Sequence, residues 1–227
     1  MKNSRLPLLL ALAGLPLMLT ACPRTPYEMP VRLTFDLPEG APDNLKLAAV
    51  SFQVQDDQTV KPVVFSRGYG YSSKTLAISL DKSQLAALSK NTRCTTPFST
   101  GEAKDMLNVS VTPGDVSTCD LFFVAYQDKN GDNNPTSEEE LYMTHDVYSY
   151  ASSAFTYSMN SKDGHSTVSG TRTQGWSLVR HTVLQPSATP GKYIVTMNSV
   201  PTEDHGIPIR LHEPTNFMIS MSTGGQP

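Results

Sequence analysis

The sequence predicts an all-β fold, a β-sandwich of immunoglobulin-like or jelly-roll type, with one short helix near residues 82–90. Three observations support this prediction. Stretches of alternating apolar and polar residues, typical of half-buried strands, recur along the chain. The 17 prolines and 14 glycines among 227 residues indicate frequent turns between them. No fixed repeat period is present, which argues against a solenoid or a propeller. Short strands at this density favour a sandwich, and a barrel is the alternative that the pattern leaves open.

The N-terminal strands are predicted by alternation. Residues 31–37 alternate apolar and polar side chains strictly, and residues 75–80 alternate except at Ala77, which predicts two half-buried strands. Residues 45–55 alternate as well, but the phase changes near Val50, which indicates a β-bulge. A further strand starts at residues 63–65. This half of the chain therefore contributes about four strands.

The helix near residues 82–90 is predicted by its start signal. Asp81 and Gln84 have the spacing of a capping box, in which side chains at the first turn satisfy free backbone N–H groups. Leu85 and Leu88 then share one face of the helix. We expect that face to be buried.

The strongest strand signal in the chain is residues 119–126, which are apolar on both faces and therefore belong at the centre of a sheet. Residues 106–112 alternate before it and end at a Pro-Gly turn. Turn residues separate the strands expected after it, which are 140–150, 154–159, 167–183, 192–200, 207–212 and 217–221.

The first 21 residues have the pattern of a signal peptide. Two basic residues precede an almost wholly apolar run over residues 6–19, which is too short and wrongly flanked for a stable transmembrane helix. The run ends in Leu-Thr-Ala-Cys at residues 19–22. This combination resembles the lipobox of bacterial lipoproteins, which implies cleavage of residues 1–21 and acylation of Cys22. Stable anchoring needs several acyl chains, and the mature N-terminus of that family carries them.

The resemblance implies an envelope protein in three parts. Residues 22–30 hold the acylated cysteine and a proline-rich tether. Residues 31–221 form the folded part, either one domain or two small ones, and residues 222–227 form a flexible tail. Pro23 stands where an aspartate often signals retention at the inner membrane, so the outer membrane or the cell surface is the expected location. The membrane is the first expected partner.

Charge excludes one class of partner. The signal peptide carries two basic residues and no acid, so the mature chain keeps 16 basic against 21 acidic side chains, a net charge near −5. Such a surface offers no electrostatic reason to bind nucleic acid.

Two cysteines remain once Cys22 is acylated. An oxidising compartment outside the cytoplasm favours a disulfide between Cys94 and Cys119. A metal-binding pair is the alternative, although the sequence lacks a C-x-x-C spacing.

The sharpest local motif covers residues 128–140, Asp-Lys-Asn-Gly-Asp-Asn-Asn-Pro-Thr-Ser-Glu-Glu-Glu. Oxygen-bearing side chains at alternate positions, closed by an acid about eleven positions on, are what Ca²⁺ needs. The motif resembles the D-x-N-G-D loops of bacterial surface proteins, and it differs from an EF-hand because glycine stands at the fourth position. A turn with solvated acids is the alternative. The predicted Ca²⁺ ligands are Asp128, Asn130, Asp132, Asn134 and Glu139.

The histidines suggest a second metal. All five lie beyond residue 144, and methionines interleave with the last two. Imidazole and thioether ligands suit copper, so a dismutase-like, copper-dependent oxidoreductase outside the cytoplasm is an alternative function. The lack of a His-x-His pair and of H-E-x-x-H argues against it. The ligands that it would use are His205, His212, Met218 and Met221.

The third candidate site is a group of tyrosines that could bind a ligand. Tyr142, Tyr148 and Tyr150 share one parity of the strand predicted at 140–150. Such side chains stack on sugars, form protein contacts, or simply pack as strand edges. A carbohydrate-active enzyme would need two acids facing each other across a cleft. The sequence lacks a G-x-S-x-G elbow, and the S-x-x-K spacing at Ser79 and Lys82 is without the other motifs of the enzymes that use it. The first hypothesis is therefore a non-catalytic lipoprotein, stiffened by calcium, that binds an envelope protein or a polysaccharide.

Overall fold

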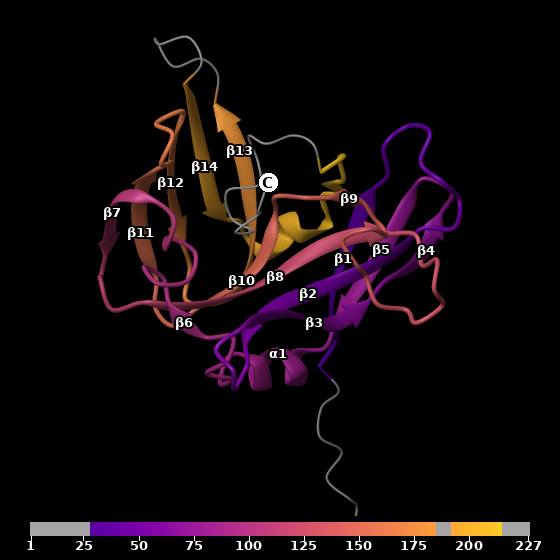
Figure 1. Ribbon diagram of the computed structural model, residues 1–227, viewed down its shortest axis with the longest axis horizontal. Coiled ribbons are helices and arrows are strands. Elements are labelled where there is room, and N and C mark those ends of the chain that lie inside the picture. Colours follow the sequence, from indigo (N-terminus) through magenta and orange to yellow (C-terminus); the bar gives the residue numbers. More distant parts are fainter. Residues whose placement is uncertain (1–27, 185–191, 215–227) are drawn as a thin grey trace, which may run out of the picture.

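The computed structural model describes residues 28–184 and 192–214 (Figure 1). These residues fold mostly as β-strands with one short α-helix, so the all-β class and the helix are confirmed. Among them, neither helical segment has the length and apolar character needed to span a membrane. The predicted signal peptide, Cys22, most of the tether, the strand at 217–221 and the tail lie outside the described residues.

The helical segments are α1 (Lys82–Leu88) and the 3-10 helix η1 (Thr202–Gly206). The strands of the described chain are β1 (Val31–Asp36), β2 (Lys46–Val54), β3 (Val60–Arg67), β4 (Tyr69–Ser72), β5 (Thr75–Leu80), β6 (Thr96–Pro97), β7 (Leu107–Thr112), β8 (Ser117–Tyr126), β9 (Glu140–Met143), β10 (Val147–Ala151), β11 (Phe155–Asn160), β12 (Ser166–Arg172), β13 (Gly175–Leu184), β14 (Tyr193–Ser199) and β15 (Ile209–Arg210).

The strands form two sheets. The smaller has the order β15-β1-β5-β4, and the larger has the order β3-β2-β8-β10-β13-β14-β12-β11-β7, with β6 and β9 pairing to β8. Each sheet contains one parallel pair, β1 with β15 and β12 with β14, among antiparallel neighbours. The predicted sandwich of immunoglobulin-like or jelly-roll type is not confirmed, because both sheets are mixed and open.

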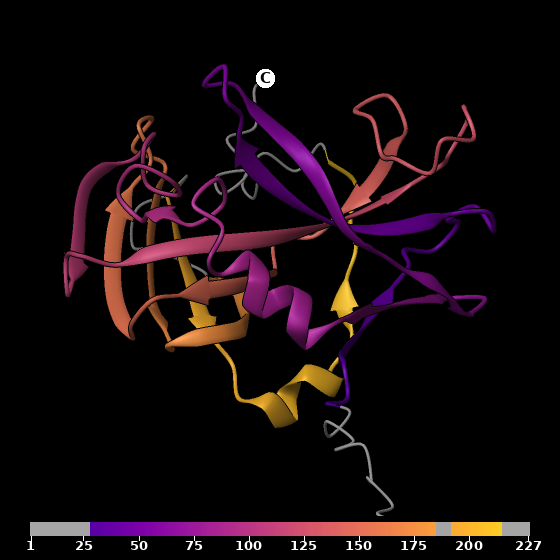
Figure 2. The same cartoon turned by 90° about the horizontal axis from the view of Figure 1, so that it is seen from below.

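Strand β8 contributes to both of the main hydrophobic cores, and Figure 2 shows it running across the molecule. One edge of β8 pairs with β6 and then β2, and the other pairs with β10 and then β9. Leu121 and Phe123 enter a first core shared with β1, β5 and α1, while Phe122 enters a second core beside β11, β12 and β14. The prediction of a central strand that is apolar on both faces is confirmed.

Local predictions in the N-terminal half are confirmed as well. Leu33 and Phe35 of β1 are fully buried. The pairing of β2 with β3 shifts register between Ala49 and Val50, where the change of phase indicated a bulge.

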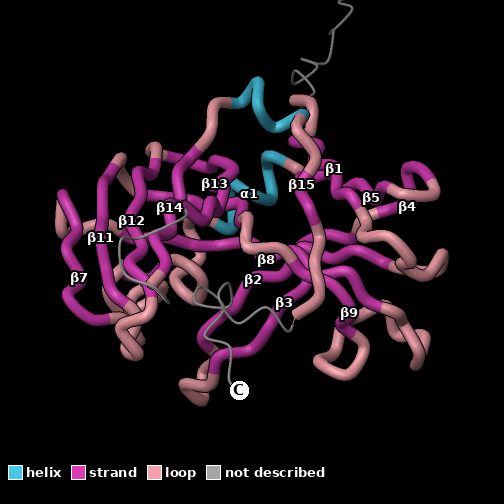
Figure 3. The backbone as a smooth tube through the Cα atoms, turned by 90° about the horizontal axis from the view of Figure 1, so that it is seen from above, coloured by secondary structure: helices cyan, strands magenta, loops and turns pink. Residues whose placement is uncertain are grey.

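Helix α1 begins and packs as its sequence predicts. The side chain of Asp81 accepts a hydrogen bond from the backbone N–H of Gln84 at 3.0 Å, as an N-cap does. Leu85 and Leu88 are buried in the first core. Figure 3 shows both helical segments near the point where the described chain begins. Helix α1 is therefore fixed against the sheet that carries β8.

The disulfide between Cys94 and Cys119 is confirmed. It joins the segment that follows α1 to β8, with the two Cα atoms 5.2 Å apart. Both cysteines lie in the first core.

Three predicted strands differ from the structure. The single strand expected at 140–150 is broken into β9 and β10, because residues 144–146 leave the ladder and the backbone N–H of Asp146 bonds to the hydroxyl of Thr144 at 3.2 Å. The strand expected at 167–183 is two strands, separated just before Gly175, whose φ is 85°. Only residues 209–210 of the strand expected at 207–212 pair as a strand.

Candidate functional site

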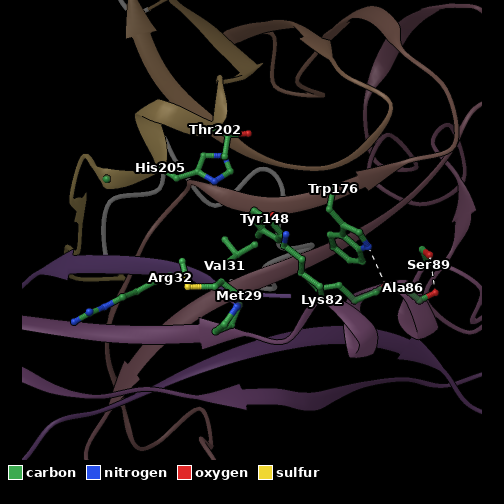
Figure 4. Close-up of a pocket in the computed structure, with 13 residues that line it drawn as sticks. Met29, Val31, Arg32, Lys82, Ala86, Ser89, Tyr148, Trp176, Thr202 and His205 are labelled. Carbon is green, nitrogen blue, oxygen red and sulfur yellow. Dashed lines mark hydrogen bonds between the residues drawn. The ribbon is translucent and has the colours of Figure 1, made fainter. Parts of the chain in front are cut away.

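A cavity of about 710 Å³ lies between α1, β10, β13 and η1 (Figure 4). The segment 29–32, where β1 begins, closes one side of it. Cavities of about 300–1,000 Å³ are typical of small-molecule sites. We call this cavity the aromatic pocket. Its lining residues include Lys82, Leu85, Ala86, Tyr148, Trp176 and His205.

Two aromatic rings form one wall of the pocket. Tyr148 of β10 and Trp176 of β13 have nearly parallel rings, 7° apart, with centroids separated by 5.7 Å. The indole Nε1 of Trp176 donates a hydrogen bond to the carbonyl oxygen of Leu85 at 2.9 Å, which ties the ring to α1. Burial raises the pKa of Tyr148 to about 12, so this phenol stays neutral. The wall is therefore uncharged, and its indole ring is held against α1.

His205 of η1 adds a polar group to this wall. Its ring lies edge-on to Tyr148, with centroids 5.9 Å apart. Burial, and then the nearby charge of Arg180, lower the pKa of His205, so the imidazole is neutral at pH 7. Its Nε2 atom is buried and makes no hydrogen bond within the described part of the chain.

The cation that faces the pocket is Lys82. Its Nζ atom is 3.7 Å from a carboxylate oxygen of Glu28, and both side chains are about half exposed or more. Such pairs are weak in water. Arg32 also lines the pocket, but its guanidinium carbon lies 4.5 Å from the ring centre of Tyr71, to which it makes a cation–π contact.

The predicted tyrosines separate in the structure. Tyr148 lines the aromatic pocket, Tyr150 packs against Trp176 with ring centroids 5.7 Å apart, and Tyr142 belongs to the neighbouring strand β9. All three pack against the first core, but only Tyr148 and Tyr150 keep the predicted shared parity, because Tyr142 lies on a separate strand. The sequence carries no sign that α1 and η1 would join β10 in one pocket, because these segments are far apart in the chain. The one sequence feature that could have indicated the pocket is Trp176, the chain's single tryptophan.

The acidic loop at 128–140 is held by two of the protein's own cations, Lys46 and Arg67. Lys46 of β2 donates hydrogen bonds to Asp128 Oδ2 and to Asn133 Oδ1, each at 2.6 Å. The bond from Lys46 is the main reason that the pKa of Asp128 is lowered. The ammonium group of Lys46 therefore binds an oxygen that the Ca²⁺ prediction assigned to the metal.

The other predicted Ca²⁺ ligands are also bonded within the protein. Asn134 Oδ1 accepts from the guanidinium of Arg67 at 2.9 Å, and the remaining three accept from the loop's own backbone. Asn130 Oδ1 accepts from the N–H of Asp132 at 2.9 Å, and Asp132 Oδ1 accepts from the N–H of Asn134 at 2.7 Å. Glu139 Oε1 accepts from the N–H of Lys129 at 2.9 Å. Across residues 28–184 and 192–214, His, Cys, Asp and Glu side chains form no group of three or more arranged to hold a metal ion. These residues do not fit Ca²⁺ as arranged, and calcium binding stays a prediction from the sequence.

Replacing Lys46 with methionine is expected to increase the response of the loop to calcium, because Asp128 loses its competing cation. With Ca²⁺ about ten times above a Kd of about 1 mM, in the range of extracellular modules, bound ion adds about 1.4 kcal/mol to stability. Calcium should therefore raise the melting temperature of Lys46→Met more than that of the wild type. Lys61→Met, on the exposed part of β3, is the control and should respond as the wild type does. Equal responses from all three proteins would contradict the expectation.

Three histidines come together, but they are not the predicted set. The ring of His145 stacks on that of His212, with centroids 4.1 Å apart and planes at 13°. The ring centroid of His181 lies 5.2 Å from that of His145. These three line a separate cavity of about 410 Å³. Since nitrogen lone pairs lie in the ring plane, two parallel stacked rings cannot both point at one ion. His205 lines the aromatic pocket and not this cavity, so the predicted pairing with His212 is not seen. The other predicted copper ligands, Met218 and Met221, lie outside the described residues.

A buried cluster of charged side chains joins β12, β8 and the segment between β6 and β7. Arg172 of β12 contacts Glu102 at 2.8 Å and Asp120 at 3.9 Å, and the three side chains are 1%, 11% and 5% exposed. Burial raises the pKa of Asp120 well above its ordinary value, Glu102 raises it further, and Arg172 offsets part of the rise. These two acids face Arg172 in the interior and not a cleft, so they do not form the acid pair that a glycosidase needs.

Comparison of the chain with protein-family models, with curated proteins and with solved structures found no match.

Proposed function

We propose that this protein is a lipid-anchored protein of the cell envelope, at the outer membrane or cell surface, and that its folded part is a binding module. The aromatic pocket would hold the ligand, an envelope component. The observation that carries the proposal is a cavity of about 710 Å³ with an aromatic wall formed by the nearly parallel rings of Tyr148 and Trp176. The anchor is supported by the lipobox-like sequence that ends at Cys22.

The anchor is tested by replacing Cys22 with serine. We expect the wild-type chain to incorporate labelled palmitate and to sediment with membranes after its signal peptide is removed. The Cys22→Ser chain should lose the label, because serine has no thiol to acylate, and its processed form should leave the membrane fraction. Processed Cys22→Ser that still sediments with membranes would contradict the anchor.

The pocket is tested by a pair of neighbouring substitutions on α1. Ala86 and Ala87 are both exposed alanines, but only Ala86 lines the aromatic pocket. Ala86→Trp should fill the cavity and weaken the binding of N-phenyl-1-naphthylamine, an uncharged apolar fluorophore, by about tenfold or more, equal to the loss of about 1.4 kcal/mol. Ala87→Trp should bind as the wild type does. If both variants bind the fluorophore equally, or the wild type does not bind it, the pocket is not the ligand site.

A further inference from the structure

We infer that the ligand of the aromatic pocket is an anionic lipid, with its apolar chain inside the cavity and its phosphate on Lys82. This inference rests on the proposed function and names the class of ligand for the same site. It follows from three features of the pocket: which of its polar groups are already bonded, which cation is exchangeable, and where the pocket lies along the chain.

The first feature favours an apolar ligand over a saccharide. Sugars are recognised through several hydrogen bonds to their hydroxyl groups, in addition to stacking. In this pocket the indole N–H of Trp176 already donates to the carbonyl oxygen of Leu85 at 2.9 Å. The hydroxyl of Ser89 already donates to the carbonyl oxygen of Ala86 at 3.0 Å. These two donors are not available to a sugar, which leaves the single buried Nε2 atom of His205 on this side of the pocket, whereas Met29, Val31 and the aromatic wall offer apolar surface.

The second feature is the charge at the rim. Figure 4 shows the Lys82 side chain extending over the pocket toward Tyr148. Its ion pair with Glu28, at 3.7 Å between exposed groups, is long and easily exchanged. A phosphate oxygen would replace Glu28 with a shorter, charge-assisted hydrogen bond. Since Arg32 is directed to Tyr71, Lys82 is the residue that selects for negative charge.

The third feature is position. Met29, in the wall of the pocket, is seven residues beyond Cys22. A fully extended chain spans about 3.5 Å per residue, so the pocket lies within about 25 Å of the acylated residue. Under the proposed anchor, the pocket is therefore held close to the headgroups of the membrane, where anionic lipids are concentrated.

The test uses the mature chain from residue 22 with Cys22→Ser, which carries no acyl chain of its own. Bound N-phenyl-1-naphthylamine is displaced by monomeric lysophosphatidylglycerol, which is anionic, or by lysophosphatidylcholine of the same chain length, which is zwitterionic. We expect the anionic lipid to bind about tenfold more tightly, and Lys82→Gln to remove most of that difference. Lys90→Gln, just beyond α1 and outside the pocket, is the matched control and should preserve it.

The outcomes separate this inference from the proposed function. If the fluorophore binds but neither lipid displaces it, the lipid inference is wrong and the proposed pocket stands. If glycerol 3-phosphate displaces it as well as the anionic lipid does, the ligand is a free phosphate compound. Displacement by oligosaccharides in place of lipids would assign the pocket to a saccharide. If the wild-type protein does not bind the fluorophore, the proposal that the aromatic pocket is a ligand site is itself contradicted.

Discussion

Replacing Arg172 with methionine is expected to lower the free energy of unfolding by about 3–5 kcal/mol at neutral pH. Arg172 is 1% exposed and contacts both Glu102 and Asp120. Removing the guanidinium leaves two buried carboxyl groups without their cation, and methionine cannot hydrogen-bond to either. For a chain of this length the loss corresponds to a fall in melting temperature of about 10 °C. Urea denaturation and thermal unfolding both measure it.

An exposed ion pair is the matched control for Arg172. Lys162 contacts Asp105 at 3.2 Å, and both side chains are 62% exposed. Lys162→Met should change stability by no more than about 0.5 kcal/mol, because water screens the pair. Adding Asp120→Asn to Arg172→Met should recover part of the loss, since one of the two uncompensated acids is then neutral. Similar losses of unfolding free energy from Arg172→Met and Lys162→Met would show that the buried cluster stabilises the fold no more than an exposed ion pair does.

Removing the disulfide is expected to cost about 3.5 kcal/mol. The bond between Cys94 and Cys119 closes a loop of 25 residues, and in the chain-entropy model a loop of that length restricts the unfolded chain by this amount. The variant with both Cys94→Ala and Cys119→Ala should therefore unfold at a lower urea concentration than the oxidised wild type, with a somewhat steeper slope, because its unfolded chain is less compact.

The reduced wild-type chain is the control for this variant. Treatment with a thiol reductant should bring the wild type to nearly the stability of the double variant, and should leave the double variant unchanged. If reduction does not change the stability of the wild type, the disulfide does not stabilise the fold.

Short-range features of this fold could be predicted from the sequence. The bulge at Val50, the N-cap at Asp81 and the burial of Leu85 depend on neighbours within a few residues. Their signals, a change of alternation, a capping residue and a helical spacing, therefore lie within one window of sequence. The central position of β8 was predictable for the same reason, because its apolar residues occupy both faces.

The candidate site could be predicted only in part. Tyr148 and His205 were both identified as candidates, but for different functions, and the structure places them in one pocket. The prediction grouped His205 with His212, whereas His212 stacks on His145. Proximity along the sequence was the only guide to that grouping. In the structure, the backbone of His212 pairs with that of Met143, which places His212 beside His145 instead.

The sequence by itself determined the all-β class, the capped helix, the disulfide partners and the expectation of an acylated Cys22, since each depends on local pattern or on elimination among few residues. The tertiary structure alone decided which side chains meet. Lys46 reaches Asp128 across 82 residues, Trp176 reaches Leu85 across 91, and Arg172 reaches Glu102 across 70. Such contacts arise from the order of strands around β8, and strand order is set by the packing of both cores together rather than by the pattern of any one segment.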